Sequence, residues 1–198
     1  MIDKIYVIDD IIPRNYQELI KETVFHTYNH QWFLKRSLSE STTEPYLDEG
    51  FADAPGFVNV FYNNHGITNP DVYNRVMPMI HEACNRVEFE FNKLLFGRSF
   101  FQMPLTTHSG ITNPHVDVNV EHLVCLYYVI DSDGETVFFD KKDDPVDSPR
   151  PSFAEGSYEI LHKVEPKQGR MVVFNGSMYH ANILPQNGMR CVINCNVV

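Results

Sequence analysis

The chain has 198 residues, of which 43% are hydrophobic and 21% charged, and its formal net charge is -10. This length suits one domain with enough apolar side chains to bury a core. A strongly acidic chain repels phosphate backbones and shows no Lys/Arg cluster that would build a basic groove, which excludes nucleic acid as a default partner.

The chain has four cysteines, Cys84, Cys125, Cys191 and Cys195. They form no Cys-x-x-Cys pair, which argues against a zinc ribbon or a thioredoxin-type site. The first residues carry acids and no long apolar run, so they do not resemble a signal peptide, and no stretch has the length of a membrane span. We therefore expect reduced thiols and a cytoplasmic protein without membrane contact.

The first half of the chain is predicted to mix strands and helices. Residues 5–8 are typical of a short strand, and Pro13 opens a pattern of apolar residues at helical spacing. Residues 37–56 are polar and contain Pro and Gly, which predicts a long surface loop. Residues 57–62 alternate well enough for a strand.

Asn69-Pro70 predicts the start of a second helix, because a capping residue is followed by Pro at the first helical position. An apolar stripe continues from Val76 to Leu94 or Leu95, and Gly97 is expected to end it. Pro78 predicts either a kink or a true start nearer Arg75.

After Gly97 the helical periodicity disappears, and short apolar runs alternate with turn residues. The predicted strands are 100–107, 116–120, 122–130, 136–139, 158–164, 171–175, 178–184 and 191–198. Many short strands with frequent turns favour a sandwich or barrel. Residues 141–157 are rich in Pro and charged residues and are expected to form a loop or lid.

A His-x-Asp pair, His115 and Asp117, lies on the predicted strand 116–120 and its approach. Alternation along a strand places both side chains on one face, where they can bind one ion. In a chain with nine His the pair alone is close to a chance occurrence. A later predicted strand contains His180, and Arg190 follows ten residues further on, which makes a chance match much less frequent.

The chemistry needs these residue types. Two neutral imidazoles and one carboxylate bind one face of ferrous iron and leave three positions for 2-oxoglutarate and dioxygen. The distal carboxylate of 2-oxoglutarate, buried in a barrel, requires a paired cation, and the planar fork of Arg190 matches a carboxylate.

The geometry predicts that His180 and Arg190 face inward from a hairpin closed by a five-residue loop, residues 185–189. Arg190, Val192, Asn194 and Asn196 would then share a polar cosubstrate face. The intervening residues of the last strand would point the other way.

At these positions the sequence resembles the 2-oxoglutarate- and Fe(II)-dependent dioxygenases, and within them the prolyl 4-hydroxylase-like group. The resemblance covers roughly residues 98–198, and a weaker resemblance lies near the N-terminus. The segments that carry it are 6–12, 114–117 (Pro-His-Val-Asp), 126–129, 133–138 (Asp-Gly-Glu-Thr-Val-Phe) and 169–174 leading to His180.

The resemblance implies a mainly β protein with flanking helices (α+β) and a double-stranded β-helix, or jelly-roll, core. It implies a single domain, 1–198, with N-terminal strands and supporting helices in 1–97 and the catalytic core in 98–198. The cofactors would be Fe(II), 2-oxoglutarate as cosubstrate and O2, with ascorbate as a candidate reductant. The reaction would be hydroxylation of an unactivated C–H bond.

The resemblance assigns iron binding and catalysis to His115, Asp117 and His180. It assigns the distal carboxylate of 2-oxoglutarate to Arg190, with Thr136 as a second contact. Tyr128 is either a residue that faces the cosubstrate or a core aromatic.

Three features of the sequence bear on the reaction. Arg190 stands where the prolyl hydroxylases usually have Lys, and Thr112 where they often have a cosubstrate-binding Tyr. Both departures weaken the case for a true prolyl hydroxylase. Asp117 favours hydroxylation, because related halogenases have Gly or Ala at that position.

Three functions remain open from the sequence. They are a hydroxylase of a peptidyl residue, a hydroxylase of a free amino acid or other small metabolite, and a non-catalytic jelly-roll binding module. A groove beside residues 37–56 would favour a peptide, and a closed cup a small molecule. A zinc hydrolase is disfavoured because no Glu is placed as a general base near the ligands. The oligomeric state is not determined.

Overall fold

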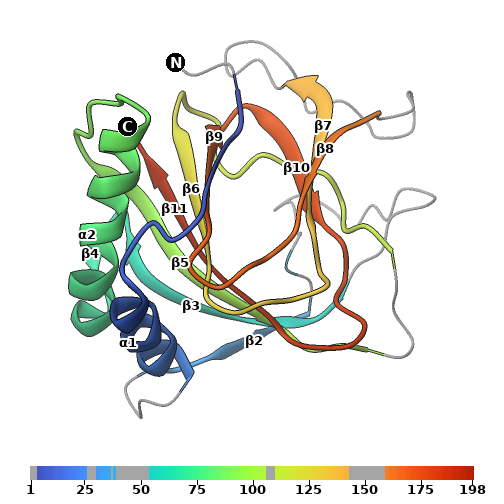
Figure 1. Ribbon diagram of the computed structural model, residues 1–198, viewed down its shortest axis with the longest axis horizontal. Coiled ribbons are helices and arrows are strands. Elements are labelled where there is room, and N and C mark those ends of the chain that lie inside the picture. Colours follow the sequence, from blue (N-terminus) through green and yellow to red (C-terminus); the bar gives the residue numbers. More distant parts are fainter. Residues whose placement is uncertain (1–3, 26–29, 37, 39–53, 106–109, 143–158) are drawn as a thin grey trace.

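The protein forms three layers, with two helices outside a large antiparallel sheet and a smaller sheet facing it (Figure 1). The computed structural model describes residues 4–25, 30–36, 38, 54–105, 110–142 and 159–198. Most of the two expected loops, 37–56 and 141–157, lies outside these residues. Of the strand expected at 100–107, residues 100–102 belong to a strand, 103–105 do not, and 106 and 107 lie outside the described residues.

The helices are α1 (Arg14–Phe25) and α2 (Pro70–Arg86). The strands of the large sheet are β1 (Tyr6–Ile8), β2 (Phe33–Lys35), β3 (Gly56–Asn63), β4 (Gly66–Ile67), β5 (Leu94–Gln102), β6 (Leu123–Tyr128), β9 (Met171–Asn175) and β11 (Arg190–Val197). Those of the small sheet are β7 (Thr136–Lys142), β8 (Ile160–Val164) and β10 (Met178–Asn182).

The large sheet has the order β1-β9-β6-β11-β5-β3-β2, with β4 paired to β3, and the small sheet has the order β10-β7-β8. One apolar core lies between the helices and the large sheet. A second apolar cluster lies where the two sheets face each other. A third joins β7 and β10 to the segment 111–116 and contains no residue of the large sheet. The expected mainly β fold with flanking helices and a jelly-roll core is confirmed.

Helix α2 begins where the sequence predicts, because the Asn69 side chain accepts a hydrogen bond from the backbone N–H of Val72 at 3.3 Å. It continues through Pro78, whose side chain is on the exposed face.

The expected helical stripe to Leu94 or Leu95 is wrong, because α2 ends at Arg86. The backbone N–H of Phe89 donates to the carbonyl of Cys84 and that of Glu88 to Asn85, with Glu88 at φ 55°. This is a Schellman end with Glu in place of the usual glycine, so the sequence carries no stop signal. Gly97 lies inside β5.

The division expected at residue 97 falls inside β5. Strands β1, β3 and β5 pair with one another or with later strands, so the N-terminal part contributes directly to the large sheet. All four cysteines are free and buried. No helix among the described residues is long and apolar enough to cross a membrane.

Candidate metal centre

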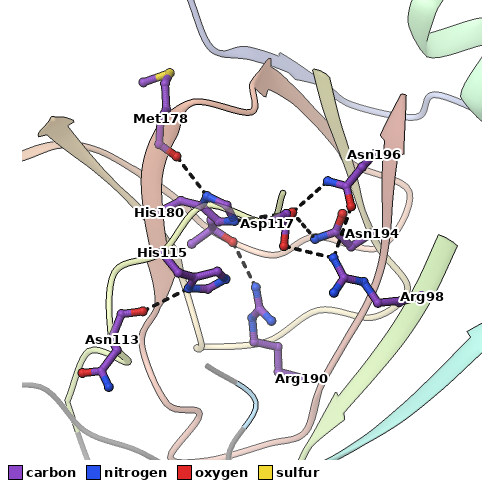
Figure 2. Close-up of polar contacts among 10 residues, drawn as sticks. Arg98, Asn113, His115, Asp117, Met178, His180, Arg190, Asn194 and Asn196 are labelled. Carbon is purple, nitrogen blue, oxygen red and sulfur yellow. Dashed lines mark hydrogen bonds and ion pairs between the residues drawn. The ribbon is translucent and has the colours of Figure 1, made fainter. Parts of the chain in front are cut away.

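His115, Asp117 and His180 converge in the space between the two sheets, as Figure 2 shows. Their nearest ligand atoms all lie within 4.8 Å of one another, and His180 Nε2 is 3.9 Å from Asp117 Oδ2. His180 is in the middle of β10, and its backbone exchanges two hydrogen bonds of 3.0 Å with that of His115. This exchange fixes the spacing of the two imidazoles.

The strand expected at 116–120 is absent from the described structure. The residues before it run beside β10 in an irregular way: Ile111 and His115 form isolated bridges with Ile183 and His180, and the backbone N–H of Thr112 donates to the carbonyl of Asn182 at 2.8 Å. Pro114 has no N–H to donate, which prevents a continuous ladder. His115 and Asp117 nevertheless both reach the same cavity, as alternation predicted.

Hydrogen bonds to backbone carbonyls orient both imidazoles. His115 Nδ1 is 3.0 Å from the carbonyl oxygen of Asn113, and His180 Nδ1 is 3.1 Å from that of Met178. A carbonyl only accepts, so each Nδ1 carries the proton and each Nε2 keeps a free lone pair. Burial lowers the pKa of His180 to about 4, so this ring is neutral at pH 7.

Asp117 is held by three polar side chains from the large sheet (Figure 2). Arg98 Nη2 donates to Oδ1 at 3.1 Å, and Asn194 and Asn196 donate to Oδ2 at 3.0 and 2.9 Å. Arg98 Nη2 also donates to Asn196 Oδ1 at 3.2 Å, which links two members of this group. We call Arg98, Asn194 and Asn196 the Asp117 clamp.

The electrostatics of this cluster keep Asp117 ionised. Burial on its own raises the pKa of the carboxyl, but Arg98, the two imidazoles and the Asn196 hydrogen bond outweigh it and hold the pKa well below its usual value. The Asp117 side chain is only 5% exposed. A buried carboxylate beside two imidazoles is a donor set that fits a divalent cation.

Arg190 lies at another part of the same cavity, at the start of β11. It is 6% exposed, and no carboxylate pairs with it in the described part of the chain. Its Nε donates to the carbonyl of Gly134 at 2.9 Å and its Nη2 to Thr136 Oγ1 at 3.0 Å. A side chain at Gly134 would press on Arg190, since a Cβ there would lie 2.9 Å from Arg190 Cδ.

Thr136 contacts the guanidinium of Arg190, and Tyr128 contacts Thr136. Tyr128 Oη donates to Thr136 Oγ1 at 2.6 Å, and both residues are fully buried. Thr136 lines the cavity, whereas the residues that line it do not include Tyr128. Thr136 therefore lies beside Arg190 in the cavity. Tyr128 does not line the cavity and is a core aromatic whose hydroxyl contacts Thr136.

The expected hairpin between His180 and Arg190 is wrong. β10 pairs with β7 in the small sheet, whereas β11 pairs with β5 and β6 in the large sheet. Residues 183–189 carry the chain from one sheet to the other, and Asp133 accepts hydrogen bonds from the backbone of Gln186 and Asn187 there. The two side chains reach one cavity from facing sheets.

The cavity has a volume of about 770 Å³ and contains the three candidate ligands, Thr136 and Arg190. Beyond the triad, its wall includes Val58 and Val60 of β3 and Phe96, Arg98 and Phe100 of β5. The guanidinium of Arg98 lies 5.5 Å and 5.4 Å from the ring centroids of Phe96 and Phe100.

The clamp was not found from the sequence. Asn194 and Asn196 were expected on the polar face of the last strand, without a link to Asp117, and Arg98 gave no signal. The only available signal was alternation on two strands, which places Arg98 and Asn194 on one face once their register is known.

Compared by sequence, the chain matches no protein-family model and none of the curated proteins. Compared by structure, it is similar to SnoN, a non-heme alpha-ketoglutarate-dependent epimerase from nogalamycin biosynthesis. The TM-score is 0.65 at 10% identity, over 98% of this chain and 78% of that one.

Two prolyl hydroxylases are also similar in structure. That of Trichoplax adhaerens, in complex with a hypoxia inducible factor peptide, has a TM-score of 0.62 at 10% identity, covering 98% of this chain and 82% of its own. That of Pseudomonas putida has a TM-score of 0.57 at 13% identity, covering 98% and 91%. The chain thus has the fold of the 2-oxoglutarate- and Fe(II)-dependent oxygenases.

Proposed function

We propose that this chain, which has the fold of the 2-oxoglutarate- and Fe(II)-dependent oxygenases, is a dioxygenase that hydroxylates an unactivated C–H bond. One observation carries the proposal. Two imidazole Nε2 atoms and a carboxylate converge in the cavity that also contains a buried Arg190 without a carboxylate partner among the described residues. The two imidazoles and the carboxylate fit a ferrous ion, and the buried guanidinium of Arg190 requires an anion.

His115, Asp117 and His180 would hold the iron. When bound, Fe(II) would supply the redox chemistry by which 2-oxoglutarate, O2 and a substrate C–H bond give succinate, CO2 and the hydroxylated substrate. The carbonyls of Asn113 and Met178 keep both Nε2 lone pairs directed at the site, and the clamp keeps the Asp117 carboxylate ionised and in place. A similar protein, SnoN, was solved with Fe3+, alpha ketoglutarate and nogalamycin RO.

Arg190 and Thr136 would bind the distal carboxylate of 2-oxoglutarate. Thr136 Oγ1 accepts from both Tyr128 Oη and Arg190 Nη2, so both of its lone pairs are used. Its own O–H is therefore left to donate, and a carboxylate next to Arg190 is the acceptor that this arrangement favours. Tyr128 acts through Thr136 by setting the direction of that hydroxyl.

The substrate would lie in the part of the cavity that is lined by β3 and β5. The volume of about 770 Å³ lies in the range of small-molecule sites, roughly 300–1,000 Å³, and leaves room for a substrate beside the cosubstrate. The Trichoplax adhaerens hydroxylase is in complex with a peptide and SnoN with nogalamycin RO, so both peptide and small-molecule substrates belong in the test.

The test is turnover of 2-oxoglutarate to succinate by the full chain with Fe(II) in air, repeated with prolyl and other peptides, free amino acids and small metabolites. We expect succinate from the wild type, with an accepted substrate gaining one oxygen atom by mass spectrometry. His180→Ala should abolish succinate formation. His162→Ala, which removes an exposed imidazole of β8, should not change it.

Three results would contradict this proposal. If the wild type consumes no 2-oxoglutarate with any compound tested, a non-catalytic binding module is the better description. If His180→Ala retains full turnover, the ligand assignment is wrong. If succinate forms and the substrate changes without gaining an oxygen atom, the reaction is not a hydroxylation and is better described as an epimerisation, the activity for which SnoN is named.

A further inference from the structure

Gln102, the last residue of β5, has a buried amide group that the site described above does not use. The residue is 2% exposed and lines the cavity. Its Nε2 is buried and has no hydrogen-bond partner in the described structure. A buried donor without an acceptor is unfavourable, so this amide is expected to meet an acceptor that enters the cavity.

A series of hydrogen bonds fixes which way this amide faces. Asn182 Nδ2 donates to the carbonyl of Ile183 at 3.0 Å, and a carbonyl only accepts, so that atom must be the nitrogen. The same Nδ2 donates to Gln102 Oε1 at 3.1 Å. The oxygen of Gln102 is therefore committed to Asn182, and the NH2 group points away from it.

Gln102 is also the direct cross-strand partner of Arg190. The register of β5 and β11 pairs the two residues, and side chains at paired antiparallel positions lie on one face with their Cβ atoms about 4.5–5.5 Å apart. Arg190 uses Nε and Nη2 for Gly134 and Thr136, and its Nη1 has no partner among the described residues. These two neighbouring strands of the large sheet therefore present hydrogen-bond donors side by side.

We propose that Gln102 is a further cosubstrate-binding residue, whose amide N–H groups donate to the distal carboxylate that pairs with Arg190. The inference rests on the proposed function. Arg190 Nη1, the Thr136 hydroxyl and Gln102 Nε2 supply donors only, and an ionised carboxylate accepts about four hydrogen bonds. The group would select 2-oxo acids with a second carboxylate over those without one.

The test measures binding of two ligands to the full chain loaded with Mn2+, which binds oxygen and nitrogen donors without turnover. The ligands are 2-oxoglutarate and 2-oxopentanoate, which lacks the distal carboxylate. Gln102→Met keeps the length of the side chain and removes the N–H donors. We expect it to weaken 2-oxoglutarate binding roughly 10- to 100-fold, as for loss of a hydrogen bond to a charged group.

The same variant should leave the Kd for 2-oxopentanoate and for Mn2+ unchanged. Gln31→Met, which alters an exposed Gln that does not line the cavity, should change none of the three Kd values. Should Gln102→Met not fold, Gln102→Glu keeps the shape and the bond from Asn182. It places an anion beside the bound carboxylate and should weaken 2-oxoglutarate binding at least as much.

The outcomes separate this inference from the function on which it rests. If the wild type with Mn2+ does not bind 2-oxoglutarate, the proposed function fails. If the wild type binds it and both Gln102 variants bind it equally well, Gln102 has no part in cosubstrate binding. If the variants weaken both 2-oxo acids equally, Gln102 does not contact the distal carboxylate, and the assignment is overturned.

Discussion

Asp117 depends on side chains far from it in the sequence. The clamp residues come from β5 and β11 and satisfy both carboxylate oxygens, while Asp117 itself lies outside any regular strand. Without them a buried carboxylate would be free to rotate and costly to ionise. The clamp therefore gives the irregular segment around Asp117 the rigidity that a metal ligand needs.

Removing one clamp residue should weaken metal binding without removing a ligand. Asn196→Ala takes away one donor to Asp117 and the acceptor for Arg98. We expect the affinity for Mn2+ to fall about 10- to 100-fold, the effect typical of partners that orient metal ligands. Asn74→Ala, on the exposed face of α2, is the matched control. Unchanged Mn2+ affinity in Asn196→Ala would show that the clamp does not support the metal site.

His30 should make the fold sensitive to acid. It is 7% exposed, lies 3.1 Å from Ser99 Oγ and packs edge-on against Trp32. Burial lowers its pKa from 6.5 to about 4. Between these values the unfolded chain binds more protons than the folded one, so stability is present above pH 6.5 and is lost as the pH falls toward 4.

The contribution of His30 to the free energy of unfolding should decrease by about 2 kcal/mol between pH 7 and pH 5. Urea unfolding at both pH values checks this against His30→Gln, which keeps a polar side chain but does not titrate. The variant should lose less stability than the wild type on acidification. Equal losses in the two proteins would show that His30 is not buried in its neutral form.

Most of the candidate site residues could be predicted, because their signals are local or follow a known order. His115 and Asp117 are two residues apart, and Arg190 follows His180 at a fixed interval. Gln102 and the clamp could not be predicted in this way. Their roles depend on which residues of β5 and β11 face each other, and that register is set by the packing of the whole sheet.

The role of Gly97 in strand β5 is set by packing and could not be read from the sequence. Gly97 is opposite Cys195 in the sheet, and a Cβ at this position would overlap the ring of Phe61, which is fully buried. Position 97 is therefore a glycine that allows close packing against Phe61, and it does not mark the end of a helix. Strands β9 and β11 were predicted almost to the residue, since their apolar runs end at turns.

Gly97→Ala should therefore destabilise the fold by about 1–3 kcal/mol, the usual cost of forcing extra atoms into a packed core. The free energy of unfolding in urea measures the effect. Gly188→Ala serves as the comparison, because a Cβ there would meet nothing within 4 Å. Equal stability of the two variants would mean that Phe61 moves aside without cost.

The site exists only in the assembled molecule. The small sheet and the segment beside it supply the three candidate ligands, while the large sheet supplies the clamp, Arg190 and Gln102. The strand pattern predicts a sandwich or barrel, and the family resemblance implies the jelly roll. The passage of residues 183–189 between the sheets could not be predicted, because a hairpin fits the same pattern of strand and turn residues. A bound metal would join β10 to the segment that contains His115 and Asp117, and the clamp links Asp117 to the large sheet.

The most direct test of the proposed function is equilibrium binding of 2-oxoglutarate under anaerobic conditions, measured with and without Fe(II). We expect the wild type to bind one 2-oxoglutarate tightly with Fe(II) and far more weakly without it, because the metal holds one end of the molecule and Arg190 the other. Asp117→Ala should lose the enhancement by Fe(II). Binding that is absent with Fe(II), or equally tight without it, would contradict the assignment of this site.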